Sequence, residues 1–350
     1  MAKTKVEFVC RECGASHHQW AGQCLDCKEW NTLEEIVISQ ATASKPESLK
    51  DLPASKVQNL SEIKSQNKDR LSTGLSELDR TLGGGLVDGS VVLIGGDPGI
   101  GKSTLILQAL ATLNEANTTL YVSGEESAEQ VSERSVRLGI REDILFIGET
   151  HLEKILKLAK DVQPKVIVID SIQTMVTDLS TSAPGSVTQV RDCAAQLTQF
   201  AKQTNTVLLM IGHVTKGGAL AGPRILEHMV DAVLYFEGDA GGRYRIIRAV
   251  KNRFGAVNEI SVFAMGEKGL QQVSNPSSIF LSNQENPSSG SMVMVTREAT
   301  RPLLIEIQAL VDQSNGTPKR VSVGLDQNRL ALQLAILHKH SGISTFDQDV

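Results

Sequence analysis

The sequence predicts an α/β fold with a mostly parallel sheet, preceded by a small four-cysteine unit. Four of the five cysteines lie between positions 10 and 27. From about Leu71 onward, short apolar runs rich in β-branched residues alternate with amphipathic helical patterns, as in βαβ units. A glycine-rich segment, 96–103, joins one of these runs to a helical pattern, at the junction where open parallel sheets build their sites.

Composition places the chain among globular proteins. It has 350 residues, of which 41% are hydrophobic and 21% are charged, and this apolar fraction is too high for a disordered chain. The net charge of −5 does not favour global attraction to nucleic acid, but it is compatible with a local basic patch. No apolar run reaches the roughly 18–20 residues that cross a bilayer, and the N-terminus has no secretory signal. We therefore expect a cytoplasmic protein with no membrane partner.

Composition along the chain predicts four parts. Residues 1–31 form the cysteine unit, and residues 32–65, rich in Ser, Lys, Glu and Gln, are expected to be a linker. Residues 66–274 carry the alternating strand and helix patterns. Residues 275–350 follow a segment rich in Asn, Pro and Ser and form a further, incomplete part.

Short apolar runs and helical periodicity locate the individual elements. Strands are expected at 90–95, 118–123, 166–169 and 206–211, and helices at 103–113, after Thr150 and around 190–201. Thr150-x-x-Glu153 has the spacing of a capping box, and Pro164 ends that helix. Residues 231–273 have a hairpin-like pattern. In the last part, strands are expected at 302–311 and 320–324, and a helix at 328–338.

The cysteine spacing predicts a structural zinc site. Cys10-x2-Cys13-x10-Cys24-x2-Cys27 has the ligand spacing of a closed tetrahedral four-thiolate site. A redox pair needs only one Cys-x-x-Cys, whereas this unit has two. In so small a unit the Zn²⁺ replaces a hydrophobic core, and we expect the unit to bind a partner.

The glycine-rich segment has the pattern G-x4-G-K-[ST] of a phosphate-binding loop. Backbone N–H groups of such a loop surround the phosphates of ATP, the lysine reaches the β- and γ-phosphates, and the hydroxyl binds Mg²⁺. A strand before the loop and a helix after it argue against a chance match. The predicted nucleotide-binding residues are Gly96, Asp97, Pro98, Gly99, Ile100, Gly101, Lys102, Ser103 and Thr104.

Two later strands are expected to supply carboxylates for hydrolysis. The run 166–169 leads directly to Asp170, which is predicted to be the second Mg²⁺ anchor. The strand at 118–123 is followed by Glu125 and Glu126, and one of them is expected to orient the attacking water. We favour Glu125 because it comes first after the strand, and Glu126 fits the role of an acid at a helix N-terminus.

Two further segments carry candidate residues. His213 follows the strand at 206–211 and is either a sensor of the γ-phosphate or an ordinary structural histidine. Lys251 and Arg253 flank Asn252 at the end of the hairpin region. They are either a solvated charged face or, like arginine fingers, stabilise the transition state on the nucleotide of a neighbouring subunit.

Together these residues resemble the bacterial RadA (Sms) family of DNA repair proteins. The resemblance extends over essentially the whole chain, and it rests on the four cysteines, GDPGIGKST (96–104), HVTKGG (213–218) and above all KNRFG (251–255). It implies a RecA-like P-loop core and a homo-hexameric ring, like that of DnaB-type helicases, with single-stranded DNA in its channel. It also implies partnership with RecA and ATP hydrolysis that drives branch migration of recombination intermediates.

The resemblance also implies roles for individual residues. Lys102 and Ser103 then hold nucleotide and Mg²⁺, and Asp170 is the Walker B acid. The segment 251–255 is expected to act between subunits and in DNA binding, through Lys251, Asn252, Arg253, Phe254 and Gly255. Loops 175–187 and 214–226 occupy positions that face DNA in RecA-like proteins. Lys216 and Arg224 are therefore either phosphate contacts or ordinary surface cations.

The C-terminal part resembles the beginning of a Lon protease domain, over about 276–350. The positions of a Ser–Lys dyad would lie beyond Val350, so no peptidase activity is expected of this chain. Two alternative functions remain at this point. One is a regulatory, clock-protein-like P-loop ATPase that acts by docking or phosphorylation, and the other is an ATP-fuelled protease subunit.

Overall fold

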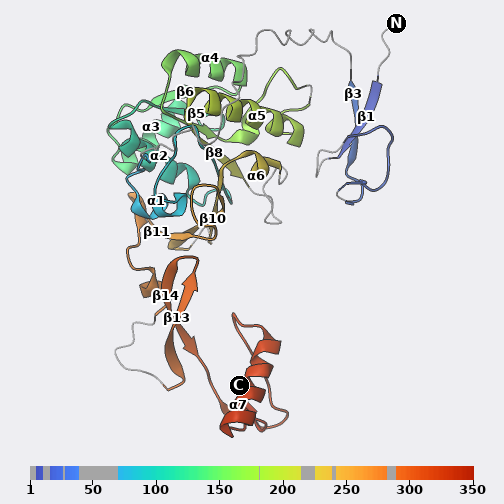
Figure 1. Cartoon of the computed structure of the whole chain (residues 1–350), viewed down its shortest axis with the longest axis vertical. Helices are drawn as coiled ribbons and strands as arrows, with labels where there is room; N and C mark the ends of the chain where they lie inside the picture. The colour runs from blue at the N-terminus through green and yellow to red at the C-terminus, as the bar shows by residue number, and fades with distance from the viewer. Residues whose placement is uncertain are drawn as a thin grey trace, which may run out of the picture. The chain divides into compact units, whose positions relative to one another are not determined.

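The computed structural model describes residues 5–10, 16–26, 28–38, 70–180, 182–213, 225–238, 242–281 and 289–350. The chain divides into two compact units, Met1–Ser274 and Asn275–Val350, which are described separately (Figure 1). Within the described ranges, no helix combines the length and apolar character needed to cross a membrane.

A small antiparallel sheet forms the N-terminal cysteine unit. Its strands are β1 (Lys5–Cys10), β2 (Ser16–His17) and β3 (Leu33–Ile38), in the order β2-β1-β3. β3 pairs with β1 along its whole length, from Ile38 opposite Lys5 to Leu33 opposite Cys10. The linker predicted from residue 32 therefore starts too early, because the β-branched run 36–38 belongs to a strand of this sheet.

A nine-stranded sheet forms the centre of the part that follows the cysteine unit, in the order β12-β11-β10-β9-β4-β8-β7-β5-β6. Its parallel strands are β4 (Val91–Gly96), β5 (Thr119–Ser123), β6 (Leu145–Gly148), β7 (Val166–Asp170), β8 (Val207–His213) and β9 (Ala232–Glu237). Antiparallel hairpins extend it through β10 (Tyr244–Asn252), β11 (Ile260–Gly266) and β12 (Gly269–Gln272). The predicted α/β fold with a mostly parallel sheet is confirmed.

Helices cover both faces of this sheet, as right-handed crossovers between parallel strands require. One layer contains α1 (Ser76–Leu82), α2 (Lys102–Asn114) and α3 (Ala128–Leu138). The other contains α4 (Leu152–Val162), α5 (Val187–Thr204) and α6 (Ile225–Met229), and a short 3-10 helix, η2 (Ile172–Thr174), follows β7.

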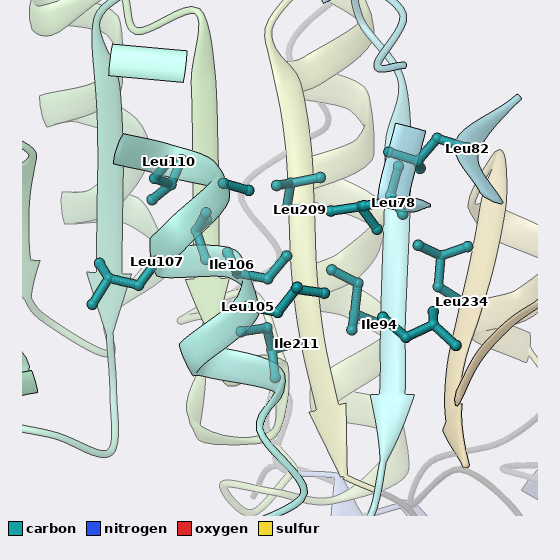
Figure 2. Close-up of a cluster of buried hydrophobic side chains, with 14 of the residues drawn as sticks. Leu78, Leu82, Ile94, Leu105, Ile106, Leu107, Leu110, Leu209, Ile211 and Leu234 are labelled. Atoms are coloured by element: carbon teal, nitrogen blue, oxygen red, sulfur yellow. The ribbon is translucent and has the colours of Figure 1, made fainter. Parts of the chain in front are cut away.

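Alternation along the strands divides the core into two layers. On β4, Val92 and Ile94 join the α1–α3 layer, whereas Val91 and Leu93 join the α4–α6 layer. Figure 2 shows side chains of the first layer, where apolar residues of α2 lie beside those of β8 and β4. Because strands buried on both faces need apolar residues at every position, these runs were readily predicted.

Sequence patterns gave no bounds for α3, missed β6 and misassigned one helix cap. Among the described residues of α3 only Val131 is buried, and β6 is a four-residue edge strand that is partly exposed, so neither has a strong apolar period. The capping box predicted at Thr150–Glu153 is wrong. His151 is the N-cap residue, and Glu153 Oε1 instead accepts a hydrogen bond from Thr177 Oγ1 at 2.5 Å.

The C-terminal unit contains a hairpin and a helix. Its elements are η3 (Pro276–Ile279), β13 (Ser291–Glu298), β14 (Arg301–Gln308), β15 (Asp312–Gln313), α7 (Gln327–Ser341) and β16 (Gln348–Asp349). β14 pairs with β13. The strand predicted at 320–324 is wrong, because these residues form no strand. There the hydroxyl of Ser322 donates to the carbonyl of Leu325 and forms a turn before α7.

Candidate functional site

Neighbouring parallel strands bring the predicted nucleotide residues to one edge of the sheet. Gly96 at the end of β4 lies opposite His213 at the end of β8. Asp170 at the end of β7 lies opposite Ile211 of β8 on one side and Ser123 of β5 on the other. Open α/β sheets bind their ligands outside these carboxyl ends. The residues predicted from distant parts of the sequence therefore meet here.

The loop between β4 and α2 encloses the ammonium group of Lys102. Its Nζ donates to the carbonyls of Gly96 and Asp97, both at 2.8 Å, and lies 3.4 Å from Nδ1 of His213. The residue is only 4% exposed. This burial lowers the pKa of Lys102, and nearby carboxylates, Asp170 foremost, act in the opposite direction. A cation is thus held in a site from which most water is excluded.

Two glycines of this loop are required by its geometry. Gly96 and Gly101 have φ angles of 151° and 113°. A Cβ at Gly96 would lie 2.7 Å from Cβ of Phe236, and one at Gly101 would lie 2.7 Å from Cε of Met265. A larger residue at Gly96 would therefore displace the loop from β9, and a side chain at either position would strain the backbone at its positive φ. The loop leads into the N-terminus of α2, where free N–H groups and the helix dipole stabilise phosphate.

A buried arginine, which sequence reasoning missed, supports the loop from β10. Arg245 is 2% exposed, and its Nε donates to the carbonyl of Ile100 at 2.9 Å. Its Nη1 donates to the carbonyls of Gly242 and Tyr244. The sequence did contain one signal for it. Side chains alternate between the two faces of a strand, so Arg245 is expected on the same inward face as Ile247.

Asp170 and Ser103 provide oxygen ligands that suit Mg²⁺. The carboxylate of Asp170 is buried, and it accepts hydrogen bonds from the hydroxyl of Ser103 and from Tyr121 Oη, the latter at 2.5 Å. Burial raises the pKa of Asp170, and these two bonds lower it. Burial also raises the pKa of Tyr121, so its phenol remains a donor. A carboxylate and a hydroxyl are hard oxygen donors, so this pair fits Mg²⁺.

Glu125 lies at the same edge and contacts His213. Its Oε1 accepts from Ser171 Oγ at 2.5 Å and lies 3.1 Å from Nε2 of His213. The bond to His213 is the main cause that holds the pKa of Glu125 below its usual range, against partial burial. The imidazole of His213 therefore lies between an ionised carboxylate and the ammonium of Lys102.

Glu126, in contrast, contacts the helix that follows it. Its carboxylate forms an ion pair with Arg134 of α3, and its backbone N–H donates to Ser123 Oγ at 2.9 Å. Both partners of the ion pair are partly buried. The structure thus separates the two consecutive acids, with Glu125 beside the loop residues and Glu126 bound to the following helix.

The KNRFG segment lies at the opposite edge of the sheet. β10 is antiparallel to β9, so Asn252 lies opposite Ala232 at the start of β9, and Ala232 pairs with Val92 of β4. From Val92 to Gly96 the strand spans about 13 Å, at about 3.3 Å per residue. Lys251 and the residues after it therefore do not reach the phosphate loop of their own chain.

Lys251 and Arg253 are held at this edge by local contacts. Lys251 Nζ donates to the carbonyls of Glu227 and Val230, at 2.5 and 2.8 Å, near the end of α6. Burial, followed by the charge of Arg253, lowers the pKa of Lys251. Arg253 Nη1 lies 3.2 Å from Oδ1 of Asp231, and its side chain is 58% exposed. The guanidinium is therefore both oriented by the chain and accessible from outside.

Asp231 organises this edge, and its replacement by alanine should destabilise the protein. It is 4% exposed, and it accepts from the backbone N–H of Val91, Lys202 Nζ and Arg253 Nη1. Because the buried N–H of Val91 loses its partner, we expect a loss of about 2–3 kcal/mol in the free energy of unfolding. Denaturant melts would measure it. Asp88→Ala, which breaks the surface pair of Asp88 with Lys165 (2.7 Å), is the control and should cost less than about 1 kcal/mol.

Two other residues of the segment build its turn. Asn252 is 9% exposed, and its amide donates to the carbonyl of Thr81 and accepts from the N–H of Phe254. A Cβ at Gly255 would lie 2.7 Å from the Cα of Gly83. Asn252 and Gly255 therefore shape the loop around Arg253, and their contact with DNA stays a prediction.

The two loops predicted to face DNA differ in what the structure describes. Lys216 and Arg224 lie outside the described residues, so their role stays a prediction. The loop after β7 is anchored at its base by the bond from Thr177 to Glu153, and Leu179 beyond it is 78% exposed. No lysine or arginine occurs in 175–187, and its one charged residue is Asp178, so the segment carries no side-chain cation for a phosphate.

The cysteine unit has side chains that fit a zinc ion. Cys10 and Cys24 are each 1% exposed and cluster with Leu33, while Cys13 and Cys27 lie outside the described residues. Two buried thiols in so small a core are typical of a unit that Zn²⁺ stabilises. His17 Nε2 lies 3.5 Å from the sulfur of Cys24.

Removal of zinc should unfold this unit and leave the core around the nine-stranded sheet intact. Both tryptophans of the chain, Trp20 and Trp30, lie in the cysteine unit, so tryptophan fluorescence reports on it alone. On treatment with a chelator we expect a fall in tryptophan anisotropy, because metal binding supplies the folding energy of such units. The melting temperature of the core, followed by circular dichroism, should not change. An unchanged anisotropy after loss of the metal would contradict this prediction.

Comparison with known proteins places these features in a family. The profile of the AAA domain family matches residues 58–219, and that of the rubredoxin metal binding domain matches residues 8–35. DNA repair protein RadA of Pseudomonas aeruginosa is 56% identical over 352 residues, which cover 100% of this chain and 78% of that protein. DNA repair protein RadA of Escherichia coli is 53% identical over 358 residues, with the same coverage of each chain.

A solved structure extends the comparison to the fold. A solved ATPase domain of another protein superposes with a TM-score of 0.51, covering 59% of this chain and 92% of that domain, at 14% sequence identity. At this identity the likeness concerns the fold alone. The sequence relatives and the domain matches show that the chain belongs to the family of DNA repair protein RadA, with an N-terminal zinc ribbon and a RecA-like ATPase core.

Proposed function

We propose that this chain is a DNA-dependent ATPase of recombination and repair. In this proposal it forms a homo-hexameric ring motor on single-stranded DNA and promotes branch migration of recombination intermediates with RecA. One observation carries the proposal: the nucleotide residues lie at one edge of the sheet, and Lys251 and Arg253 lie at the opposite edge. Such a subunit completes a site only with a neighbour, and head-to-tail contacts of this kind close into rings.

The loop residues bind the nucleotide. Lys102 exchanges its bonds to the carbonyls of Gly96 and Asp97 for the β- and γ-phosphates, and the N-terminus of α2 stabilises their charge. Ser103 and Asp170 are the residues that would hold Mg²⁺. When bound, this ion neutralises charge on the phosphate oxygens.

Glu125 acts on the attacking water, and His213 responds to nucleotide binding. The ionised carboxylate of Glu125 accepts a proton from the water that attacks the γ-phosphate. His213 contacts both Glu125 and Lys102, so a movement of Lys102 away from it on nucleotide binding changes the partners of its ring. In this proposal the change at His213 is passed on to the DNA.

The neighbouring subunit supplies the missing charge. Arg253 is exposed and oriented by Asp231, as an arginine finger must be, and Lys251 fixes the same turn to α6. Residues of this kind contribute about 10³–10⁵ to the rate of phosphoryl transfer. Hydrolysis then depends on assembly, and DNA in the ring stimulates it by aligning the subunits.

Rates of ATP hydrolysis with and without single-stranded DNA, over a range of protein concentrations, test the proposal. We expect stimulation by DNA that rises with protein concentration and is lost in Lys251→Ala and Arg253→Ala. Arg137→Ala, which removes an exposed arginine of α3, is the control and should retain stimulation. A rate that ignores DNA and both substitutions would contradict the motor and favour a regulatory ATPase.

A further inference from the structure

Tyr121 makes a contact that no known motif of the chain includes. It lies on β5 and is 1% exposed, and its ring stacks on Phe146 with centroids 6.3 Å apart. Its hydroxyl donates to Oδ2 of Asp170 at 2.5 Å. The strand register explains how this hydroxyl reaches Asp170. Ser123 lies opposite Asp170, and Tyr121 comes two residues before Ser123 on the same face of the sheet.

From this geometry we infer that Tyr121 is a positioning residue that fixes the carboxylate of Asp170 for Mg²⁺. The phenol holds Oδ2 of Asp170, and the hydroxyl of Ser103 also bonds to this carboxylate, so the phenol fixes the orientation of Asp170 beside the residue that would share the ion. Loss of a hydrogen bond that orients a metal ligand in this way typically lowers metal affinity by about 10–100-fold. The inference rests on the proposed Mg²⁺-dependent binding of ATP.

The surroundings of the contact favour orientation over simple packing. Asp170 is buried beside the acids Glu125 and Glu126, so its carboxylate needs donors to remain well placed. Tyr121 is held by the ring stack and by the strand, so its hydroxyl has little freedom to turn away. A phenylalanine at position 121 would keep the ring and remove only the donor.

Binding of a fluorescent, non-hydrolysable ATP analogue, titrated with Mg²⁺ and repeated in EDTA, tests this role. In Tyr121→Phe we expect the half-saturating Mg²⁺ concentration to rise by about 10-fold or more, as for other outer ligand contacts. The affinity in EDTA should not change. Tyr244→Phe, which removes a hydroxyl from β10, should match the unchanged protein in both conditions.

Asp170→Asn distinguishes a failure of the role inferred for Tyr121 from a failure of the proposed Mg²⁺ site. Asp170→Asn should itself raise the Mg²⁺ requirement, and adding Tyr121→Phe to it should have no further effect. Two outcomes would show that the inference is wrong while the proposed function stands. In the first, Asp170→Asn alters the Mg²⁺ requirement and Tyr121→Phe does not. In the second, Tyr121→Phe weakens binding of the analogue equally with and without Mg²⁺. If Asp170→Asn has no effect, the proposed Mg²⁺ site is wrong. Thermal melts of each variant show whether it is folded.

Discussion

Lys102→Ala should lower the rate of ATP hydrolysis by at least about 100-fold, because it removes a preorganised cation from the phosphate site. The same substitution should not lower the melting temperature. The ammonium group is buried, and burial lowers the pKa of Lys102. The lowered pKa means that the folded protein stabilises the charged form of Lys102 less well than water does. The lysine is thus placed for function at the expense of stability.

Steady-state phosphate release and thermal melts of the same preparations measure both effects. Lys165→Ala is the matched control, because Lys165 is partly exposed and pairs with Asp88 at the other edge of the sheet. It should leave hydrolysis unchanged. A Lys102→Ala protein that hydrolyses ATP normally, or that melts several degrees lower, would show that the lysine is structural.

Glu125→Gln should lower the rate of the chemical step by about 10²–10⁴-fold and preserve ATP binding. The amide keeps the size of the side chain and a carbonyl oxygen for Ser171, but it cannot accept a proton from water. Because the contact with His213 keeps the pKa of Glu125 low, the carboxylate is ionised at neutral pH. Its loss therefore removes an available base.

Glu126→Gln is the internal control, since it changes the next residue in the same way. We expect normal hydrolysis and a loss of about 1–3 kcal/mol in stability, because Arg134 is partly buried and loses its charged partner. Single-turnover hydrolysis and denaturant melts distinguish the two variants. The reverse pattern, with Glu126→Gln inactive and Glu125→Gln less stable, would exchange the roles of the two acids.

Sequence patterns predicted the part of the fold that is set by local signals. The runs that became β4, β7 and β8 are apolar at every position because both faces of the sheet are covered. The phosphate loop was evident because its glycines and Lys102 have a fixed spacing. The meeting of Asp170, Glu125 and His213 at one edge followed from the rule that parallel strands end on the same side.

Contacts between distant segments could not be predicted in this way. The bond from Tyr121 to Asp170 depends on the pairing of β5 with β7, and the support of the loop by Arg245 depends on the register of β10. The capping box failed because Glu153 found a better partner in the loop after β7. β6 was missed because an edge strand that is partly exposed needs no continuous apolar run.

Each nucleotide should be hydrolysed by residues of two subunits, and mixing two inactive variants tests this most directly. Lys102→Ala retains Arg253, and Arg253→Ala retains Lys102. In a mixed ring at equal amounts, about one quarter of the interfaces join an intact loop to an intact finger.

We therefore expect each variant alone to be inactive in DNA-stimulated hydrolysis and the mixture to recover activity. Recovery should be lost when the double variant Lys102→Ala/Arg253→Ala replaces either partner. A mixture that stays inactive after subunit exchange, or an Arg253→Ala protein with full activity alone, would contradict a site shared between subunits.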